Sequence, residues 1–149
     1  MTDDERLRLI ALDAEDLAVM SAYAQDAVLK ISDIKWMPGE KRFVVPMNRF
    51  AWDALGTSRR KRAYQRRRAA LHFARVEGIK SAGIDRADGE TVLELLAVRF
   101  EPHVEPSGDV VLDFAGGPTI RLAVECIEAQ LTDLGPTWST QHVPRHVLA

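Results

Sequence analysis

The sequence predicts an α+β fold, a mostly antiparallel curved sheet or partly open barrel of about six to seven strands with two helices. One helix is expected in the N-terminal half and one at the C-terminal end. Several apolar runs alternate with a period of two and are joined by hairpin turns, and only two segments have a helical period. The chain has 149 residues, of which 46% are hydrophobic. We therefore expect one domain over residues 1–149, with a core that needs no disulfides.

The N-terminal part of the chain predicts a short strand followed by a helix. Residues 7–12 are mostly apolar and are typical of a strand. Asp13 stands at a helix N-cap position, and carboxylates follow in the first turn, where they favour the helix dipole. Over residues 14–25 the apolar positions recur at i, i+3 and i+7: Leu17, Met20 and Ala24. We expect this helix to cover the sheet.

The next segment predicts a β-hairpin. Residues 28–36 are rich in β-branched and aromatic side chains, residues 37–40 have the composition of a turn, and apolar residues alternate over 43–47. Pro46 has no N–H to donate to a neighbouring strand. We therefore expect the second strand to lie at a sheet edge or to bulge at this proline.

The middle of the chain predicts a long connection and two further strands. Residues 54–68 contain glycine, threonine, serine and many arginines and are interpreted as a loop. Strand character returns over 69–76, with His72 on the face opposite Leu71 and Phe73. Residues 91–100 are the most apolar strand candidate, and both of their alternating sets are apolar. We therefore expect both faces of that strand to be covered.

The C-terminal part predicts a hairpin and a second helix. Alternating residues 110–114 and 120–124 flank a Gly-Gly-Pro turn, which is the clearest hairpin signal in the chain. Residues 125–134 have apolar side chains at i, i+4 and i+7, and Gly135 with Pro136 has the composition of a helix stop. The tail, 137–149, is expected to be extended. This order of elements resembles the pleckstrin-homology-like arrangement, a likeness of topology that implies no ligand.

The most unusual feature is a basic segment inside the predicted loop. Between Ala54 and Val76 there are eight basic residues and no acidic one, whereas the whole chain has a formal charge of −2, so the remainder carries −10. A positive stripe of this kind attracts polyanions even on a protein whose net charge is negative. The expected contact residues are Arg59, Arg60, Lys61, Arg62, Tyr64, Arg66, Arg67 and Arg68.

The basic segment has three interpretations. It could contact an acidic protein or another anionic partner. It could bind RNA or a single strand, with Tyr64 stacking on a base, although no RNA-binding fingerprint accompanies it. It could also be a solvated loop whose arginines pair with carboxylates of the same molecule or of a partner subunit.

Candidate catalytic residues are few. Cys126 falls at the start of the predicted second helix, where the helix dipole favours a thiolate, but glutamates flank it and oppose one. His142 and His146 have the i, i+4 spacing of metal ligands, with Pro144 between them. Glu94 is a carboxylate within the most apolar strand, which can mark a catalytic site or a residue at the strand rim.

The familiar enzyme motifs are missing from the sequence. There is no Gly-x-Gly-x-x-Gly run, no nucleophile elbow, no His-Glu-x-x-His motif and no phosphate loop. We expect neither a metal nor a cofactor, and enzymatic activity is disfavoured. No apolar run approaches the ~20 residues that a membrane-spanning helix needs. The acidic start does not resemble an export signal, so we expect a cytoplasmic protein.

Four segments of the chain resemble those of a known family. They are 48–52, 66–73, 95–102 and 125–136, and the last is the most distinctive. Together they resemble a family of short bacterial proteins catalogued as a domain of unknown function. The resemblance implies a soluble, single-domain bacterial protein and brings no activity, cofactor or catalytic residue.

Three functional hypotheses follow from these observations. The preferred one is a non-catalytic binding or adaptor domain that contacts an anionic partner through the basic segment. The second is nucleic-acid binding through the same segment. The third is an enzyme or small-ligand domain without a recognisable motif, which would use Glu94, His72 or Cys126 and requires that these side chains converge on one pocket.

Overall fold

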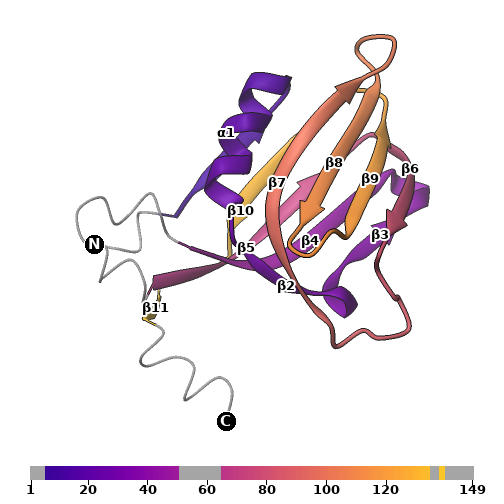
Figure 1. Ribbon diagram of the computed structural model, residues 1–149. Coiled ribbons are helices and arrows are strands. Elements are labelled where there is room, and N and C mark those ends of the chain that lie inside the picture. Colours follow the sequence, from indigo (N-terminus) through magenta and orange to yellow (C-terminus); the bar gives the residue numbers. More distant parts are fainter. Residues whose placement is uncertain (1–5, 51–64, 135–137, 140–149) are drawn as a thin grey trace.

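The computed structural model describes residues 6–50, 65–134 and 138–139, which form a mostly antiparallel open sheet with one helix (Figure 1). The elements, in chain order, are β1 (Arg8–Ala11), α1 (Ala14–Ala24), β2 (Val28–Lys30), β3 (Lys35–Met37), β4 (Arg42–Phe50), β5 (Gln65–Phe73), β6 (Val76–Ala82), β7 (Val92–Pro102), β8 (Gly108–Phe114), β9 (Thr119–Val124), β10 (Ala129–Asp133) and β11 (Trp138–Ser139). Short 3-10 turns occupy Ile31–Asp33 and Pro38–Glu40. The α+β class is confirmed, but these residues form more strands and fewer helices than predicted.

The sheet curves into two layers. Its strand order is β1-β10-β5-β4-β2-β7-β8-β9-β6, with β3 added beside β4 and β11 beside β5. Strands β7, β8 and β9 form the front layer in Figure 1, and β10, β5 and β4 lie behind them. The short strand β2 joins the layers because Val28 pairs with both β4 and β7. At the other side β3 and β6 are not paired, so the barrel stays open there.

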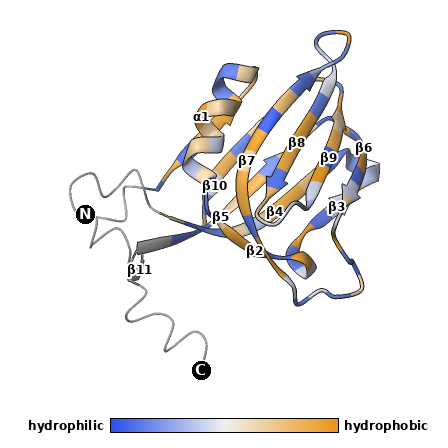
Figure 2. Ribbon diagram, viewed as in Figure 1, coloured by the Kyte–Doolittle hydropathy of each residue, from blue (hydrophilic) through white to orange (hydrophobic). Residues whose placement is uncertain are grey.

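The core lies between the two layers and is built by strand alternation. Figure 2 shows the alternation of apolar and polar residues along β7, β8 and β9. The largest fully buried apolar side chains come from both layers: Phe43, Met47, Leu71, Phe73, Leu95, Leu112, Phe114 and Leu122. Each such side chain stabilises the fold by roughly 1.5–3 kcal/mol relative to an exposed one. The predicted hairpin of β8 and β9 is confirmed, and Gly116 and Gly117 turn it with φ of 89° and 106°.

The predicted first helix is confirmed as α1. The Asp13 carboxylate accepts a hydrogen bond of 2.8 Å from the Asp16 N–H, which caps the helix, and the buried residues are the predicted Leu17, Met20 and Ala24. The Ser21 hydroxyl accepts a 2.8 Å bond from the Val98 N–H, which ties α1 to β7. Of the helices in the described residues, none is long and apolar enough to cross a membrane.

The prediction that both faces of β7 are covered is wrong. Leu93 and Leu95 point inward, whereas Val92 and Leu96 are 57% and 43% exposed. A β-bulge between Leu95 and Ala97 then shifts the alternation by one residue and turns Val98 inward. The inward residues are odd-numbered before the bulge and even-numbered after it. Apolar residues therefore occur in both alternating sets of the strand.

The predicted second helix is a strand. β10 pairs with β1 on one side and β5 on the other; its inward positions are Ala129, Leu131 and Asp133, and Ile127, just before the strand, is also buried. The spacing of four between Ile127 and Leu131 fits a strand as well as a helix. Leu134, the third position of the supposed helical stripe, is 53% exposed. The pleckstrin-homology-like ending with a C-terminal helix is therefore absent from the described part of the chain.

Three boundaries near the basic segment differ from prediction. β4 is an interior strand, not an edge, and Pro46 lies between the residues paired with β3 and the residue paired with β2. β5 begins at Gln65 and not at 69, so the end of the expected loop is a strand. β6 was not predicted, because its sequence does not alternate between apolar and polar residues. Most of its residues are exposed, and the register shifts between Val76 and Gly78.

A buried ionic cluster joins β4, β5 and β10. Arg49 and Arg67 are direct cross-strand partners, and both are at most 1% exposed. The Arg49 Nε and Nη2 donate to the two Asp133 oxygens at 2.8 and 2.9 Å, and the Arg67 Nη1 lies 3.5 Å from Asp133 Oδ2. The Leu7 N–H also donates to this carboxylate at 2.8 Å. One carboxylate thus faces two cations, and the Nε and Nη1 of Arg67 make no hydrogen bond within the described residues.

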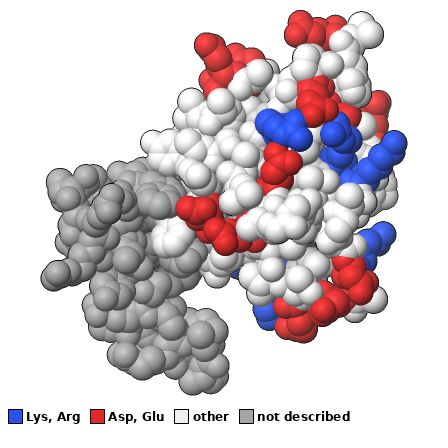
Figure 3. All heavy atoms as spheres, in the orientation of Figure 1, with Lys and Arg blue, Asp and Glu red and all other residues white. Residues whose placement is uncertain are grey.

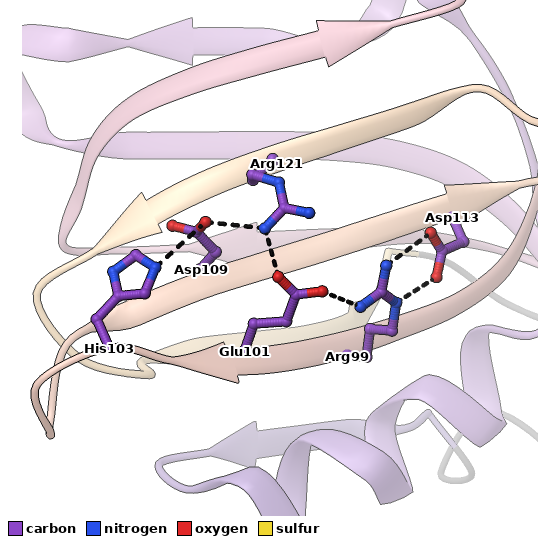
Figure 4. A network of polar contacts seen from close by, with 6 residues as sticks. All are labelled: Arg99, Glu101, His103, Asp109, Asp113 and Arg121. Carbon is purple, nitrogen blue, oxygen red and sulfur yellow. Dashed lines mark hydrogen bonds and ion pairs between the residues drawn. The ribbon is translucent and has the colours of Figure 1, made fainter.

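A second polar network covers the outer face of β7, β8 and β9 (Figure 4). Arg99 donates to Asp113 at 2.7 Å and to Glu101, and Arg121 donates to Glu101 at 2.6 Å and to Asp109 at 2.9 Å. Hydrogen bonds from Arg121 and then Arg99 lower the pKa of Glu101. Because each of the two arginines bonds to two carboxylates on neighbouring strands or on its own strand, this network links β7, β8 and β9 at the surface.

The buried cluster makes a prediction about stability. Asp133→Asn removes the buried carboxylate that both Arg49 and Arg67 face and should lower the free energy of unfolding by about 3–5 kcal/mol. Arg67→Met keeps the Arg49–Asp133 pair, removes the unpartnered N–H groups and should cost less than about 1.5 kcal/mol. Urea denaturation followed by circular dichroism measures both. Equal losses for the two variants would contradict the unequal roles of the two arginines.

The surface network makes a prediction about pH. The folded-state pKa of Glu101 lies below its ordinary value of 4.5, so the contribution of Glu101 to stability is present above that value and is lost as the pH falls through the lowered pKa. Arg121→Gln should raise the pKa of Glu101 in a carbon-13 NMR titration. Lys80→Gln is the matched control, because Lys80 is the cross-strand partner of Arg121 and is not among the groups that shift the pKa of Glu101. An unchanged pKa in Arg121→Gln would refute the assignment.

Candidate functional site

Most of the predicted contact residues of the basic segment lie outside the described residues. These are Arg59, Arg60, Lys61, Arg62 and Tyr64. Arg66 belongs to β5 and pairs with Trp138 in the ladder, but its side chain is not described. Only Arg67, Arg68 and Arg75 of the eight cations have described side chains.

The three described cations of the segment do not share a surface. Arg67 is in the buried cluster, and Arg68, its neighbour in β5, points to the opposite face, where it lies 3.7 Å from Asp33. Arg75 follows β5 at its other end and lies 3.2 Å from Glu128. Each of the three therefore has a carboxylate of its own chain nearby. Figure 3 shows a face on which basic and acidic side chains of the described part are interspersed.

The three candidate catalytic residues do not converge. Glu94 is exposed on β7, His72 lines a small cavity of about 150 Å³ beside β1, and Cys126 lines another of about 340 Å³ beside Phe100. Burial lowers the pKa of His72, and the Arg42 guanidinium lowers it further. Cys126 precedes a strand and not a helix, so the argument from a helix dipole does not apply. No group of three potential metal ligands occurs among the described side chains, and His142 and His146 lie outside them.

A cavity of about 530 Å³ lies at the open side of the barrel. One wall comes from β3 and β4 and the 3-10 turn between β2 and β3, and it consists of Trp36, Phe43, Ile31 and Ile34. Trp36 and Phe43 are cross-strand partners whose rings lie 6.4 Å apart at an angle of 57°. This wall is therefore a continuous apolar surface fixed by strand pairing.

The opposite wall comes from β6 and β9. Ile79 and Ser81 lie two residues apart on β6 and so share a face, and Ile120 of β9 pairs directly with Ser81. Lys80, between them in sequence, points to the outer surface beside Arg121. Strand alternation thus gives this wall an apolar character with one hydroxyl.

The connection from β6 to β7 closes the cavity and supplies Ile84, Arg86 and Gly89. Its backbone is held by bonds from the Ser32 N–H to the Gly89 carbonyl at 3.0 Å and from the Ile31 N–H to the Thr91 carbonyl at 3.1 Å. A Cβ atom on Gly89 would lie 3.0 Å from the Ser32 Cβ, so this close approach requires glycine or a shift of the serine.

The polar groups of the cavity are few. Ser32 and Ser81 contribute hydroxyls, and Arg86 is the only charged side chain among the described residues of the lining. Among the described residues, no carboxylate forms an ion pair with Arg86. The cavity thus combines apolar walls with one unneutralised guanidinium at its rim.

The sequence did not identify this site. The isoleucines that line the cavity belong to four separate segments of the chain. The available signal was a run of three residues, Ile84, Asp85 and Arg86, inside an otherwise polar connection. The sequence alone does not show that β3 and β6 lie on opposite sides of one cavity. It therefore could not connect this short run with the other lining residues.

The comparisons with known proteins identify a family and no activity. Neither the curated proteins nor the solved structures give a match to the chain. A family model described as "Protein of unknown function (DUF2948)" matches residues 7–146, nearly the whole chain. This protein therefore belongs to the DUF2948 family of proteins of unknown function, as the resemblance of its four segments implied.

Proposed function

We propose that this chain is a binding domain that takes a small, mostly apolar molecule in the cavity between β3 and β6. The observation that carries the proposal is the cavity itself. Its volume of about 530 Å³ lies within the range of small-molecule sites, which are concave, mostly apolar and contain a few placed polar groups.

The walls of the cavity are preformed. Phe43 and Ile120 are 1% and 4% exposed and belong to strands that are paired on both sides. These buried side chains hold the strands that carry the more accessible lining residues, such as Trp36 and Ile79, so little conformational entropy would be lost on binding. A cavity with such ordered walls is suited to binding apolar molecules, which distinguishes it from an ordinary surface depression.

The chemistry of the lining supports binding more than catalysis. It contains two hydroxyls and one guanidinium, and the described lining residues include no carboxylate, imidazole or thiol. General acid–base catalysis requires a group that can exchange a proton near neutral pH, and an arginine does not provide one. The three candidate catalytic residues, Glu94, His72 and Cys126, do not line this cavity.

Filling the cavity tests the proposal. Ser81→Trp should place an indole between the walls and abolish binding of 1-octanol, measured by isothermal titration calorimetry. Lys80→Trp is the matched control, since it adds the same indole to the same strand on the outer face. Wild-type protein and the control should bind with a negative heat-capacity change, the mark of apolar burial. Absence of binding to the wild type, or equal binding to Ser81→Trp, would refute the proposal.

A second candidate function rests on the charge distribution. Five cations of the basic segment, Arg59, Arg60, Lys61, Arg62 and Arg66, remain after the three with internal carboxylate neighbours are set aside. The rest of the chain is acidic, so an anionic partner would be attracted to this segment and repelled elsewhere. An acidic protein surface is the preferred partner, and a single-stranded nucleic acid is the alternative.

The two anionic partners differ in a binding assay. Fluorescence anisotropy with a labelled polyglutamate peptide and a labelled single-stranded oligonucleotide separates them. Five phosphate contacts predict a log–log salt slope of about −3.5 for the oligonucleotide. The triple variant Arg59→Ser, Arg60→Ser, Arg62→Ser should weaken binding strongly. The control Arg6→Ser, Arg8→Ser, Lys35→Ser removes the same charge from other exposed positions. Equal weakening by both variants would indicate that only net charge matters.

A further inference from the structure

We infer that the ligand of the cavity is an anionic amphiphile, a molecule with an apolar chain and a carboxylate head, and that Arg86 binds the head. This inference rests on the proposed function and names the class of ligand. The juxtaposition behind it is a cation, Arg86, that forms no ion pair with the described residues and lies beside the accessible apolar side chains of Trp36, Ile79 and Ile84.

The charge of Arg86 is available to a ligand. Other arginines of the described surface, such as Arg99 and Arg121, are held by two carboxylates each. Arg86 forms no such pair with any described residue. A guanidinium presents several N–H donors in a planar fork that matches both oxygens of a carboxylate. An anionic head at the rim would therefore gain hydrogen bonds without first breaking an internal ion pair.

The acidic residues of the same connection are not part of the cavity lining. The Asp85 carboxylate accepts a 3.0 Å bond from the Ala87 N–H, and Glu90 lies 3.2 Å from the Lys30 ammonium. Asp88 donates its N–H to the Asp85 carbonyl at 3.0 Å. None of these three acids lines the cavity. The electrostatic preference within the cavity is thus set by Arg86, and it favours a negative head over a positive one.

The two serines complete the polar end of the site. Ser32 lies on the turn after β2 and Ser81 on β6, so the hydroxyls come from opposite walls. Hydroxyls can donate to carboxylate oxygens, whereas a purely apolar ligand would leave them without a partner. Apolar walls, two hydroxyls and a guanidinium together match a molecule that is apolar along its length and anionic at one end.

The experiment compares three ligands of equal chain length. Octanoate, 1-octanol and octylamine are titrated separately at pH 7 into the wild type, Arg86→Gln and Lys80→Gln, below the concentrations at which the ligands aggregate. Octanoate should bind the wild type about tenfold more tightly than octanol, and octylamine should bind most weakly. Arg86→Gln should abolish the preference for octanoate, and Lys80→Gln should keep it, because Lys80 faces away from the cavity.

The outcomes separate the inference from the proposed function. If octanol and octanoate bind the wild type equally, or if octylamine binds best, the inference fails and the binding cavity stands. If Arg86→Gln retains the preference for octanoate, Arg86 is not the head-group residue and the inference fails. If none of the three ligands binds the wild type, both the inference and the proposed function fail. Thermal unfolding of Arg86→Gln controls for folding, which this exposed side chain should not affect.

Discussion

The open edge between β3 and β6 is the constraint on which the rest of the structure depends. Strand pairing runs without a break from β1 to β6, but the path ends there, and β3 is only three residues long. One backbone bond of 2.9 Å, from the Val76 N–H to the Lys41 carbonyl, ties the start of β6 to the start of β4. Elsewhere along this side, side chains must close the barrel, and isoleucines, Trp36 and Phe43 do so incompletely. The cavity is what remains.

The fold could be predicted wherever the alternation of apolar residues was regular. The α1 helix with its Asp13 cap and the hairpin of β8 and β9 follow from local sequence alone. Prediction failed where the spacing of apolar residues fits both a helix and a strand. It also failed where a bulge changes which residues of a strand point inward. Ile127 and Leu131 fit a helix and a strand equally, and only the pairing of β10 between β1 and β5 decides for the strand. The bulge at Leu95 reverses the inward set of β7, and nothing in the local sequence marks it.

The candidate site could not be predicted for a related reason. A run of basic residues in a sequence is a surface patch only if the chain presents its side chains on one side. In β5 consecutive residues point to opposite faces, so Arg67 enters the core and Arg68 does not. Arg67 then meets Arg49, its cross-strand partner, and both share Asp133, which is 84 residues from Arg49 in sequence. The density of charge was visible in the sequence, but its division between the interior and the surface depends on the strand boundary at Gln65.

The connection from β6 to β7 shows how the open edge can acquire specificity. Loops at the rim of a barrel are normally costly to order on binding, and this cost reduces affinity. Here the connection is already fixed by Asp85, by its own backbone bonds and by the bonds to Ile31 and Ser32. The turn after β2, which interrupts the sheet, thus also positions the segment that carries Arg86. The turn after β2 lines the cavity and also anchors the connection from β6 to β7. The shape of the cavity and the position of Arg86 therefore both depend on this turn.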